Sequence, residues 1–188
     1  MRKLIVTELV SVDGVMEAPG GEPNYPHTGW AIDYMGPEQI DLKMHETLDA
    51  ESLLIGRITY ESFLEGWSEQ TGEFADKMNF MPKQVVSTTL KNPEWNNSTV
   101  ISGDVIDEIK RVKRSDGGSI LVAGSRTLVH TLMHNDLVDE YRFMIFPVIL
   151  GSGLRVFPES PNKTVLQLTD TRSFPNGVVS QTYQPSRE

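Results

Sequence analysis

Four turns along the chain place glycine or hydroxyl side chains directly after a short apolar run that is typical of a buried strand. Glycine lets a ligand approach the backbone closely, hydroxyl groups form hydrogen bonds, and the N-terminus of a following helix presents free N–H groups that favour an anion. The pattern therefore predicts a site for a phosphate-bearing ligand. The four turns are Gly56-Arg57-Ile58-Thr59, Ser87-Thr88-Thr89, Ser102-Gly103-Asp104 and Gly124-Ser125-Arg126-Thr127.

Several such turns in one sheet favour a dinucleotide over a mononucleotide, because a ligand with more than one phosphate would occupy more than one turn. The G-x-G-x-x-G fingerprint of many dinucleotide sites is absent, and so is its acidic ribose partner. Arg57 has a fork geometry suited to phosphate, and with Ser87 and Thr88 it would suit a 2′-phosphate. We therefore expect NADP(H) rather than NAD. Each turn taken alone also fits a structural role, since Thr59 and Ser125 can cap helices.

The elements that must position these turns follow from the hydrophobic pattern. Apolar runs predict strands over 3–10, 52–56, 83–88, 98–102, 119–123, 138–150, 163–174 and 177–184. A helix is expected from Pro37, with Ile40, Met44 and Leu48 as its apolar stripe. Further helices are predicted over 57–65, 104–114 and 125–135, whereas 13–36 and 66–82 are expected to be irregular.

The order of these elements predicts an α/β fold in a single domain over residues 1–188. Strands and helices alternate over the first two thirds of the chain, which favours parallel pairing with helices on both faces of the sheet. Strands then follow one another, and Asn176-Gly177 is a strong hairpin signal. We therefore expect a mixed, mostly parallel sheet with an antiparallel C-terminal edge, and ligands beyond the carboxyl ends of its strands.

Composition excludes several classes of protein. The chain has 188 residues and no Cys, so disulfide frameworks, thiolate metal sites and Cys nucleophiles are ruled out. With 17 Lys and Arg against 26 Asp and Glu, the net charge of −9 argues against nucleic acid as a partner. No apolar run approaches the roughly 18 residues of a membrane span. His130 and His134 lack the glutamate of a metal motif. We expect a cytoplasmic protein that binds neither membrane nor metal.

Five segments, in order along the chain, resemble the reductase domain of bacterial riboflavin biosynthesis and its relative dihydrofolate reductase. Val10-Ser11-Val12-Asp13-Gly14 resembles the S-x-D-G opening of the riboflavin-type domain. Residues 54–61 (LIGRITYE) resemble the G-R-x-T-[YW]-E segment of both, and 85–90 (VVSTTL) resemble their third strand. Gly124-Ser125 with Leu128 is similar to their glycine turn before a helix. Residues 147–153 (PVILGSG) with Phe157 resemble the P-x-x-x-G-x-G…F segment of the riboflavin branch.

This resemblance implies the dihydrofolate-reductase-like fold, with NADPH bound across the strand ends. It places Gly56, Arg57 and Thr59 on the adenosine side, Ser87 and Thr88 near the 2′-phosphate, Gly124, Ser125 and Leu128 at the pyrophosphate, Ile149 and Gly151 near the cofactor, and Val10, Ser11 and Gly14 at the nicotinamide. Ser102 joins this cofactor set because it ends a neighbouring predicted strand.

Two aspartates are candidate proton donors. Dihydrofolate reductase carries an acid on its first helix, and Asp41 falls close to that place in the chain. At the edge of the stripe of Met44 and Leu48 its carboxyl would have a raised pKa, as a donor needs, and the alternative is a solvated helix residue. Asp13 is the second candidate, unless it only shapes its turn or water donates the proton. Trp30 would stack on the substrate ring or, alternatively, anchor the core.

We expect an NADPH-dependent reductase that transfers a hydride to a small planar heterocycle, pterin-like or pyrimidine-like. One alternative is the riboflavin-pathway enzyme itself, 5-amino-6-(5-phosphoribosylamino)uracil reductase, although no basic residues for a ribose phosphate can be placed in the sequence. Another is a non-catalytic NADP(H)-binding or sensing protein. Because related reductase domains pair through their C-terminal strands, we also expect a homodimer.

Overall fold

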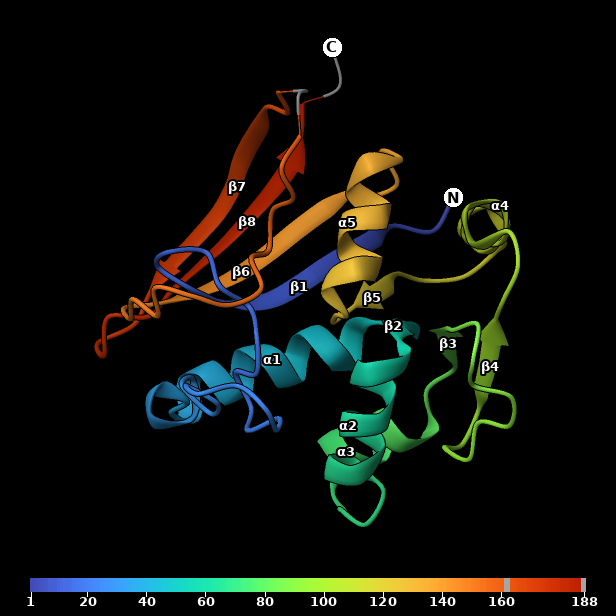
Figure 1. Cartoon of the computed structure of the whole chain (residues 1–188), viewed down its shortest axis with the longest axis horizontal. Coiled ribbons are helices and arrows are strands. Elements are labelled where there is room, and N and C mark those ends of the chain that lie inside the picture. Colours follow the sequence, from blue (N-terminus) through green and yellow to red (C-terminus); the bar gives the residue numbers. More distant parts are fainter. Residues whose placement is uncertain (161–162, 187–188) are drawn as a thin grey trace.

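The computed structural model describes residues 1–160 and 163–186, and in this part of the chain eight strands form one sheet (Figure 1). The strand order is β4-β3-β2-β5-β1-β6-β8-β7. The strands are β1 (Leu4–Ser11), β2 (Ser52–Gly56), β3 (Lys83–Val86), β4 (Ser98–Ile101), β5 (Ile120–Val122), β6 (Glu140–Phe146), β7 (Leu166–Ser173) and β8 (Val179–Pro185). The helices are α1 (Pro37–Asp49), α2 (Arg57–Trp67), α3 (Glu73–Phe80), α4 (Val105–Arg114) and α5 (Arg126–His134), with a 3₁₀ turn at Ile32–Tyr34.

The directions of the strands confirm the predicted mixed sheet. The six strands from β4 to β6 pair in parallel, whereas β8 runs antiparallel to both β6 and β7. The β7–β8 hairpin turns at Asn176-Gly177, where Gly177 has a φ of +86° and donates its N–H to the carbonyl of Phe174. This positive φ is the conformation that glycine adopts without strain, which is why the dipeptide was a reliable hairpin signal.

Helices cover both faces of the sheet, as predicted (Figure 1). Because side chains alternate along a strand, Leu54 packs in one apolar cluster while its neighbours Leu53 and Ile55 pack in another. The cluster of Leu54 contains residues of α4 and α5, and the cluster of Leu53 and Ile55 contains residues of α2 and α3. A third cluster, under the long loop and the start of α1, surrounds Phe146.

Helix α1 begins at Pro37 as predicted, but its buried face is not the expected one. Ile40 is 46% exposed, and Met44 and Leu48 are only partly buried. The buried residues are instead Gln39, Glu46 and Thr47. The strand face opposite this part of α1 carries polar side chains, so the helix turns its own polar residues toward the sheet.

Helix α3 corrects the sequence interpretation, and helix α4 confirms it. Helix α3 lies within a stretch expected to be irregular, and it is held by Asn79, whose side chain bonds the carbonyl of Trp67 and the indole N–H of Trp95. These are tertiary contacts, and the hydrophobic pattern of a helix of only two turns does not indicate them. Helix α4 is capped by Asp104, as predicted, at 3.0 Å from the N–H of Asp107. None of the described helices has the length and apolar character that crossing a membrane requires.

Candidate active site

The turns that follow β2 and β5 meet at the carboxyl edge of the sheet. The N–H of Gly56 donates a hydrogen bond to the carbonyl of Gly124 at 3.3 Å, and the Gly124–Ser125 peptide bond is cis. A Cβ atom at position 56 would lie 2.2 Å from the Oγ of Ser125, and one at position 124 would lie 2.8 Å from the Oγ1 of Thr59. The close approach therefore requires glycine at both positions. We call Gly56, Thr59, Gly124 and Ser125 the glycine junction.

Helices α2 and α5 both begin at the glycine junction. Gly56 and Ser125 precede their first turns, and neither residue caps its helix with a side-chain hydrogen bond. Neither first turn contains an acidic residue, in contrast to α4, which Asp104 caps. Two helix N-termini with free N–H groups and positive dipole ends thus converge on one place, which favours a ligand with linked phosphates.

The turns after β2, β3 and β4 lie side by side, because these strands pair in parallel up to their last residues. Arg57, Ser87 and Ser102 therefore follow neighbouring strand ends, and Thr88 and Ser102 are exposed. Ser87 is buried, and its Oγ accepts the N–H groups of Thr89 and Leu90 at 3.1 and 2.9 Å. Its hydroxyl shapes the turn, while Thr88 remains accessible.

Arg57 already has a partner on its own helix. Its Nη1 lies 2.8 Å from both carboxylate oxygens of Glu61. The two side chains are 41% and 51% exposed, and exposed ion pairs of this kind contribute little to stability. Arg57 is therefore free to exchange Glu61 for a phosphate at small cost.

Asp13 holds the loop that contains Ile149 and Gly151. Its carboxylate accepts hydrogen bonds from the Ser11 hydroxyl at 2.6 Å and from the N–H groups of Leu150 and Gly151 at 3.2 and 2.9 Å. The bond from Ser11 is the main reason why the pKa of Asp13 lies below its ordinary value. A carboxylate stabilised in its ionised form is poorly suited to donate a proton, so the geometry favours the turn-shaping alternative.

Three other residues of the predicted cofactor set are buried by their own packing. Val10, Ser11 and Leu128 are 5%, 1% and 4% exposed. They could reach a cofactor through the backbone only. Ile149, by contrast, is 76% exposed and has an apolar side chain free to contact a ligand.

Trp30 is a core anchor, and the expectation that it stacks on a substrate is wrong. Its side chain is 9% exposed, its Nε1 donates to the carbonyl of Glu17 at 2.7 Å, and its ring packs edge-on against Phe146 with centroids 5.4 Å apart. The indole is thus enclosed by contacts within the protein. The alternative stated for this residue is therefore the correct one.

Asp41 lies on the solvent side of α1. Its side chain is 57% exposed, and its Oδ1 is 3.4 Å from the Nδ1 of His45. The apolar surroundings expected for a proton donor are absent, because Met44 and Leu48 do not form the buried stripe. Asp41 is a solvated helix residue in this structure.

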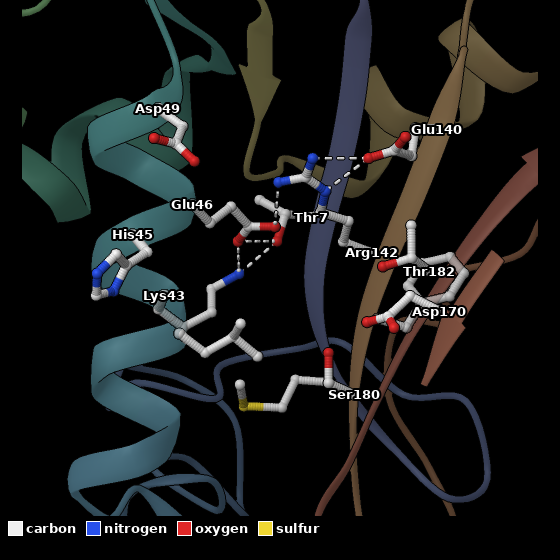
Figure 2. A pocket seen from close by; sticks show the side chains of 13 residues that line it. Thr7, Lys43, His45, Glu46, Asp49, Glu140, Arg142, Asp170, Ser180 and Thr182 are labelled. Atoms are coloured by element: carbon white, nitrogen blue, oxygen red, sulfur yellow. Dashed lines mark hydrogen bonds and ion pairs between the residues drawn. The ribbon is translucent and has the colours of Figure 1, made fainter. Parts of the chain in front are cut away.

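A cavity of about 350 Å³ lies between α1 and strands β1, β6 and β8 (Figure 2). Leu42 and Met144 supply its apolar surface, whereas the ring of Phe143, which also borders the cavity, packs with Leu54 in the cluster on the other face of the sheet. Its polar lining consists of Thr7, Lys43, His45, Glu46, Asp49, Glu140, Arg142, Asp170, Ser180 and Thr182. We call this cavity the α1 pocket.

A network centred on Glu46 fixes the polar wall of the α1 pocket. The Oε2 of Glu46 accepts hydrogen bonds from the Thr7 hydroxyl, at 2.7 Å, and from the Lys43 ammonium. Its Oε1 lies 3.4 Å from Arg142, which in turn pairs with Glu140 at 2.7 Å. Figure 2 shows these side chains directed toward one another from the helix and the strands. Donors and acceptors are thus held in defined positions beside apolar surface.

Strand β1 connects the α1 pocket to the glycine junction through two successive residues. Thr7 faces the pocket, and its neighbour Glu8 points to the opposite side of the sheet. The Oε1 of Glu8 accepts the N–H of Gly124 at 2.7 Å. Glu8 is 9% exposed, and burial raises its pKa to about 8.

Sequence reasoning missed Glu8, Lys43, Glu46 and Arg142. Two signals were present in the sequence. Gln39, Lys43 and Glu46 recur at helical spacing and form a polar face on α1, and Glu8 interrupts an otherwise apolar strand core. From the sequence, a polar helix face is interpreted as facing solvent unless the strand that it packs against is known.

The two histidines on α5 both contact backbone carbonyl groups. The Nε2 of His130 lies 3.1 Å from the carbonyl of Arg155, and the Nδ1 of His134 lies 2.7 Å from the carbonyl of His130. Within residues 1–160 and 163–186 there is no group of three or more His, Cys, Asp or Glu arranged to hold a metal ion.

Comparison with known proteins identifies the family and supports the fold. The model of a family described as the RibD C-terminal domain matches residues 2–180. The uncharacterized protein YyaP of Bacillus subtilis (strain 168) is 27% identical over 97% of this chain and 94% of its own.

Two solved structures have the same architecture. A Shewanella sp. PV-4 protein named for riboflavin biosynthesis superposes with a TM-score of 0.76 at 19% identity, covering 98% of this chain and 99% of that one. Acinetobacter baumannii RibD superposes with a TM-score of 0.66 at 13% identity, over all of this chain and 59% of that one. These likenesses confirm the expected dihydrofolate-reductase-like fold.

Proposed function

Since the chain belongs to the family of RibD C-terminal domains, reductase domains of the riboflavin-pathway type, we propose that it is an NADPH-dependent reductase of a small heterocycle without a phosphate group. The observation that carries the proposal is the glycine junction, where two uncapped helix N-termini converge at the carboxyl edge of the sheet.

The residues at this edge fit an NADP-type cofactor. Gly56 and Gly124 let the two turns pack together, so that the starts of α2 and α5 offer N–H donors to a pyrophosphate in one place. Arg57 and Thr88 are accessible beside them for a 2′-phosphate. When bound, NADPH supplies the hydride, and the protein's part is to bind and orient both reactants.

The α1 pocket is the proposed substrate site. Thr7 lines it, and the next residue of β1, Glu8, bonds the glycine junction on the other face of the sheet, so the two reactants would have to meet beyond the carboxyl end of this strand. Leu42 and Met144 offer apolar surface for a ring, while Glu46 and Arg142 offer an acceptor and donors for its polar edge. Glu46, rather than Asp41, is then the α1 carboxylate placed to hydrogen-bond the substrate.

The charges of the α1 pocket argue against a phosphorylated substrate. Its lining contains four carboxylates but only two permanent cations, and both cations are already paired with carboxylates. A substrate phosphate would therefore meet net negative charge. This favours a pterin-like or pyrimidine-like heterocycle over 5-amino-6-(5-phosphoribosylamino)uracil.

Binding and turnover assays separate the alternatives. NADPH is first titrated into the protein by fluorescence, and dihydrofolate, dihydropterins, carbonyl compounds and the phosphoribosylaminouracil are then added while NADPH oxidation is followed. We expect turnover with an unphosphorylated heterocycle. Turnover with the phosphorylated substrate alone would establish the riboflavin step, and binding without any turnover would establish a sensor. Absence of NADPH binding would refute the proposal.

Arg57→Ala tests the assignment of the 2′-phosphate. Loss of one charged, partly exposed hydrogen-bonding contact should weaken NADPH binding by about 1.5 kcal/mol, roughly tenfold, and leave NADH binding nearly unchanged. Glu61→Gln is the matched control, because it removes the competing partner of Arg57 and should leave NADPH affinity equal or tighter. Equal weakening of NADH by Arg57→Ala would show that Arg57 does not read the 2′-phosphate.

The expected homodimer is also a proposal. Strand β7 forms the edge of the sheet, nearly all of its residues are exposed, and Leu168 is 47% exposed. Natural proteins rarely leave such an edge open, and a second copy would cover it. Light scattering coupled to size exclusion should give twice the monomer mass of 21.1 kDa, and a monomer would contradict this.

A further inference from the structure

Glu8 lies beneath the glycine junction, and the proposed function gives its carboxyl group no role. It stands in the central strand β1, and its carboxyl reaches across to the N–H of Gly124 at 2.7 Å. Gly124 in turn accepts a hydrogen bond from Gly56. Glu8 therefore supports, from inside the protein, the turn at which α2 and α5 begin.

The second carboxyl oxygen of Glu8, Oε2, accepts no hydrogen bond from the residues that the structure describes. A buried ionised carboxylate normally requires several donors or a paired cation. With a single N–H donor, the neutral acid is the form that this environment favours. Burial accordingly raises the pKa of Glu8 to about 8, so that at neutral pH most molecules carry a protonated Glu8.

We propose that Glu8 is a positioning residue that, as a neutral acid, holds the Gly124 turn for the anionic cofactor, and that ionisation of Glu8 weakens cofactor binding. This inference rests on the proposed function. The neutral carboxyl oxygen accepts the Gly124 N–H without adding charge beneath the pyrophosphate site. The ionised carboxylate keeps the hydrogen bond but places a full negative charge under the phosphates.

The charged groups that act on Glu8 come from α1. Lys43 lowers the pKa of Glu8 and Glu46 raises it, and both effects are smaller than that of burial. Strand β6 pairs the apolar Phe143 with Glu8. Arg57 and Arg126 begin α2 and α5 next to the glycine junction. The pH at which Glu8 ionises should therefore respond to substitutions on α1, although these residues lie on the other face of the sheet.

The proposal predicts a definite pH dependence of cofactor affinity. If the ionised form does not bind, the dissociation constant of NADPH rises as the neutral fraction falls, about tenfold between about pH 7 and about pH 9. NADH is titrated in parallel, because it lacks the 2′-phosphate and so controls for ionisation of that group. In Glu8→Gln, whose amide oxygen can accept the same N–H, the affinity should match that of the wild type at neutral pH and stay constant up to about pH 9.

Two further variants distinguish a titrating Glu8 from a merely structural one. Glu46→Gln removes a negative charge and should shift the midpoint of the affinity loss to lower pH, whereas Lys43→Met should shift it to higher pH. A purely structural Glu8 would leave the midpoint unchanged in both. Parallel shifts in the expected directions support the proposal, and an unmoved midpoint overturns it.

Unfolding of the protein without cofactor gives an independent readout. A group whose pKa is higher in the folded state stabilises the protein below its unfolded pKa, and this contribution is lost as pH rises to its folded pKa. Wild-type stability should therefore decline between pH 4.5, the ordinary pKa of a glutamate, and about 8, and Glu8→Gln should lose that component. A wild type and a Glu8→Gln variant with the same pH profile would overturn the inference.

The two proposals fail in different ways. If the unfolding profile shows the Glu8 component but NADPH does not bind at any pH, the proposed function is refuted, and this inference with it. If NADPH binds the wild type with an affinity that does not change up to about pH 9, the inference alone is refuted and the proposed function stands.

Discussion

Gly124→Ala probes the closest contact of the glycine junction. Gly124 has a φ of +74°, a conformation that costs a residue with a Cβ roughly 1–2 kcal/mol. The new Cβ would also lie 2.8 Å from the Oγ1 of Thr59, so one of the two must move. Overpacking of this kind costs roughly 1–3 kcal/mol. Together these effects should lower the free energy of unfolding by about 2–5 kcal/mol.

Gly151→Ala is the matched control for backbone strain. Its φ is +76°, almost that of Gly124, but a Cβ there meets no atom within 4 Å. This variant should therefore lose only the roughly 1–2 kcal/mol of the backbone conformation. The difference between the two variants isolates the steric contact with Thr59.

The double variant Thr59→Ala/Gly124→Ala completes a thermodynamic cycle. Removing the Thr59 hydroxyl and methyl leaves its Cβ at 3.8 Å, an ordinary contact, so the steric part should be recovered as a coupling of about 1–3 kcal/mol. Urea unfolding followed by tryptophan fluorescence measures the wild type, Thr59→Ala, Gly124→Ala, the double variant and the Gly151→Ala control, since the chain has 3 Trp. Equal losses for Gly124→Ala and Gly151→Ala, or strict additivity in the cycle, would refute the close-packed junction.

Three other substitutions test the surroundings of the site. Trp30→Ala should destabilise the protein by roughly 3–5 kcal/mol in urea unfolding, since it empties a buried indole site, and an unchanged stability would contradict its role as a core anchor. Glu46→Gln should lower the free energy of unfolding by about 1–3 kcal/mol in the same assay. This is the lower part of the range for buried ion pairs, because Lys43 and Arg142, which lose their partner, are 21% and 31% exposed. An unchanged stability would show that the network is not formed. Asp13→Ala should speed amide hydrogen exchange at Leu150, because the Leu150 N–H loses its acceptor, and protection that persists in the variant would contradict this contact. In the wild type the same loop should loosen only below pH 3.8, the ordinary pKa of an aspartate, because the pKa of Asp13 is lowered.

The residues at the strand ends were predictable because the signals that mark them are local. A strand, a glycine or serine turn and a helix start occupy a few consecutive residues, so Gly56 and Gly124 could be assigned to turns one at a time. The rule that parallel strands carry ligands at their carboxyl ends then brings these turns to one edge. The Asp104 cap and the Asn176-Gly177 hairpin were found for the same reason.

The residues of the α1 pocket were not predictable, because they depend on what α1 meets. An apolar stripe is expected to face the core, and Ile40, Met44 and Leu48 satisfied the helical spacing. The structure turns the polar face inward instead, so that Glu46 bonds Thr7 across the gap. Asp41 was misplaced by the same error, since its expected environment depended on that stripe.

Trp30 and Glu8 show the same division between local and tertiary information. The sequence places Trp30 in a long loop, where both a ligand contact and a core contact are open to it, and only the position of Phe146 decides between them. The sequence alone determined the order of the elements, the mixed sheet and the turns at its carboxyl edge, which are set by short-range backbone and hydrophobic preferences. The tertiary structure decided which polar groups are buried, and with them the α1 pocket and the raised pKa of Glu8, because desolvation and pairing depend on atoms that lie far apart in the chain.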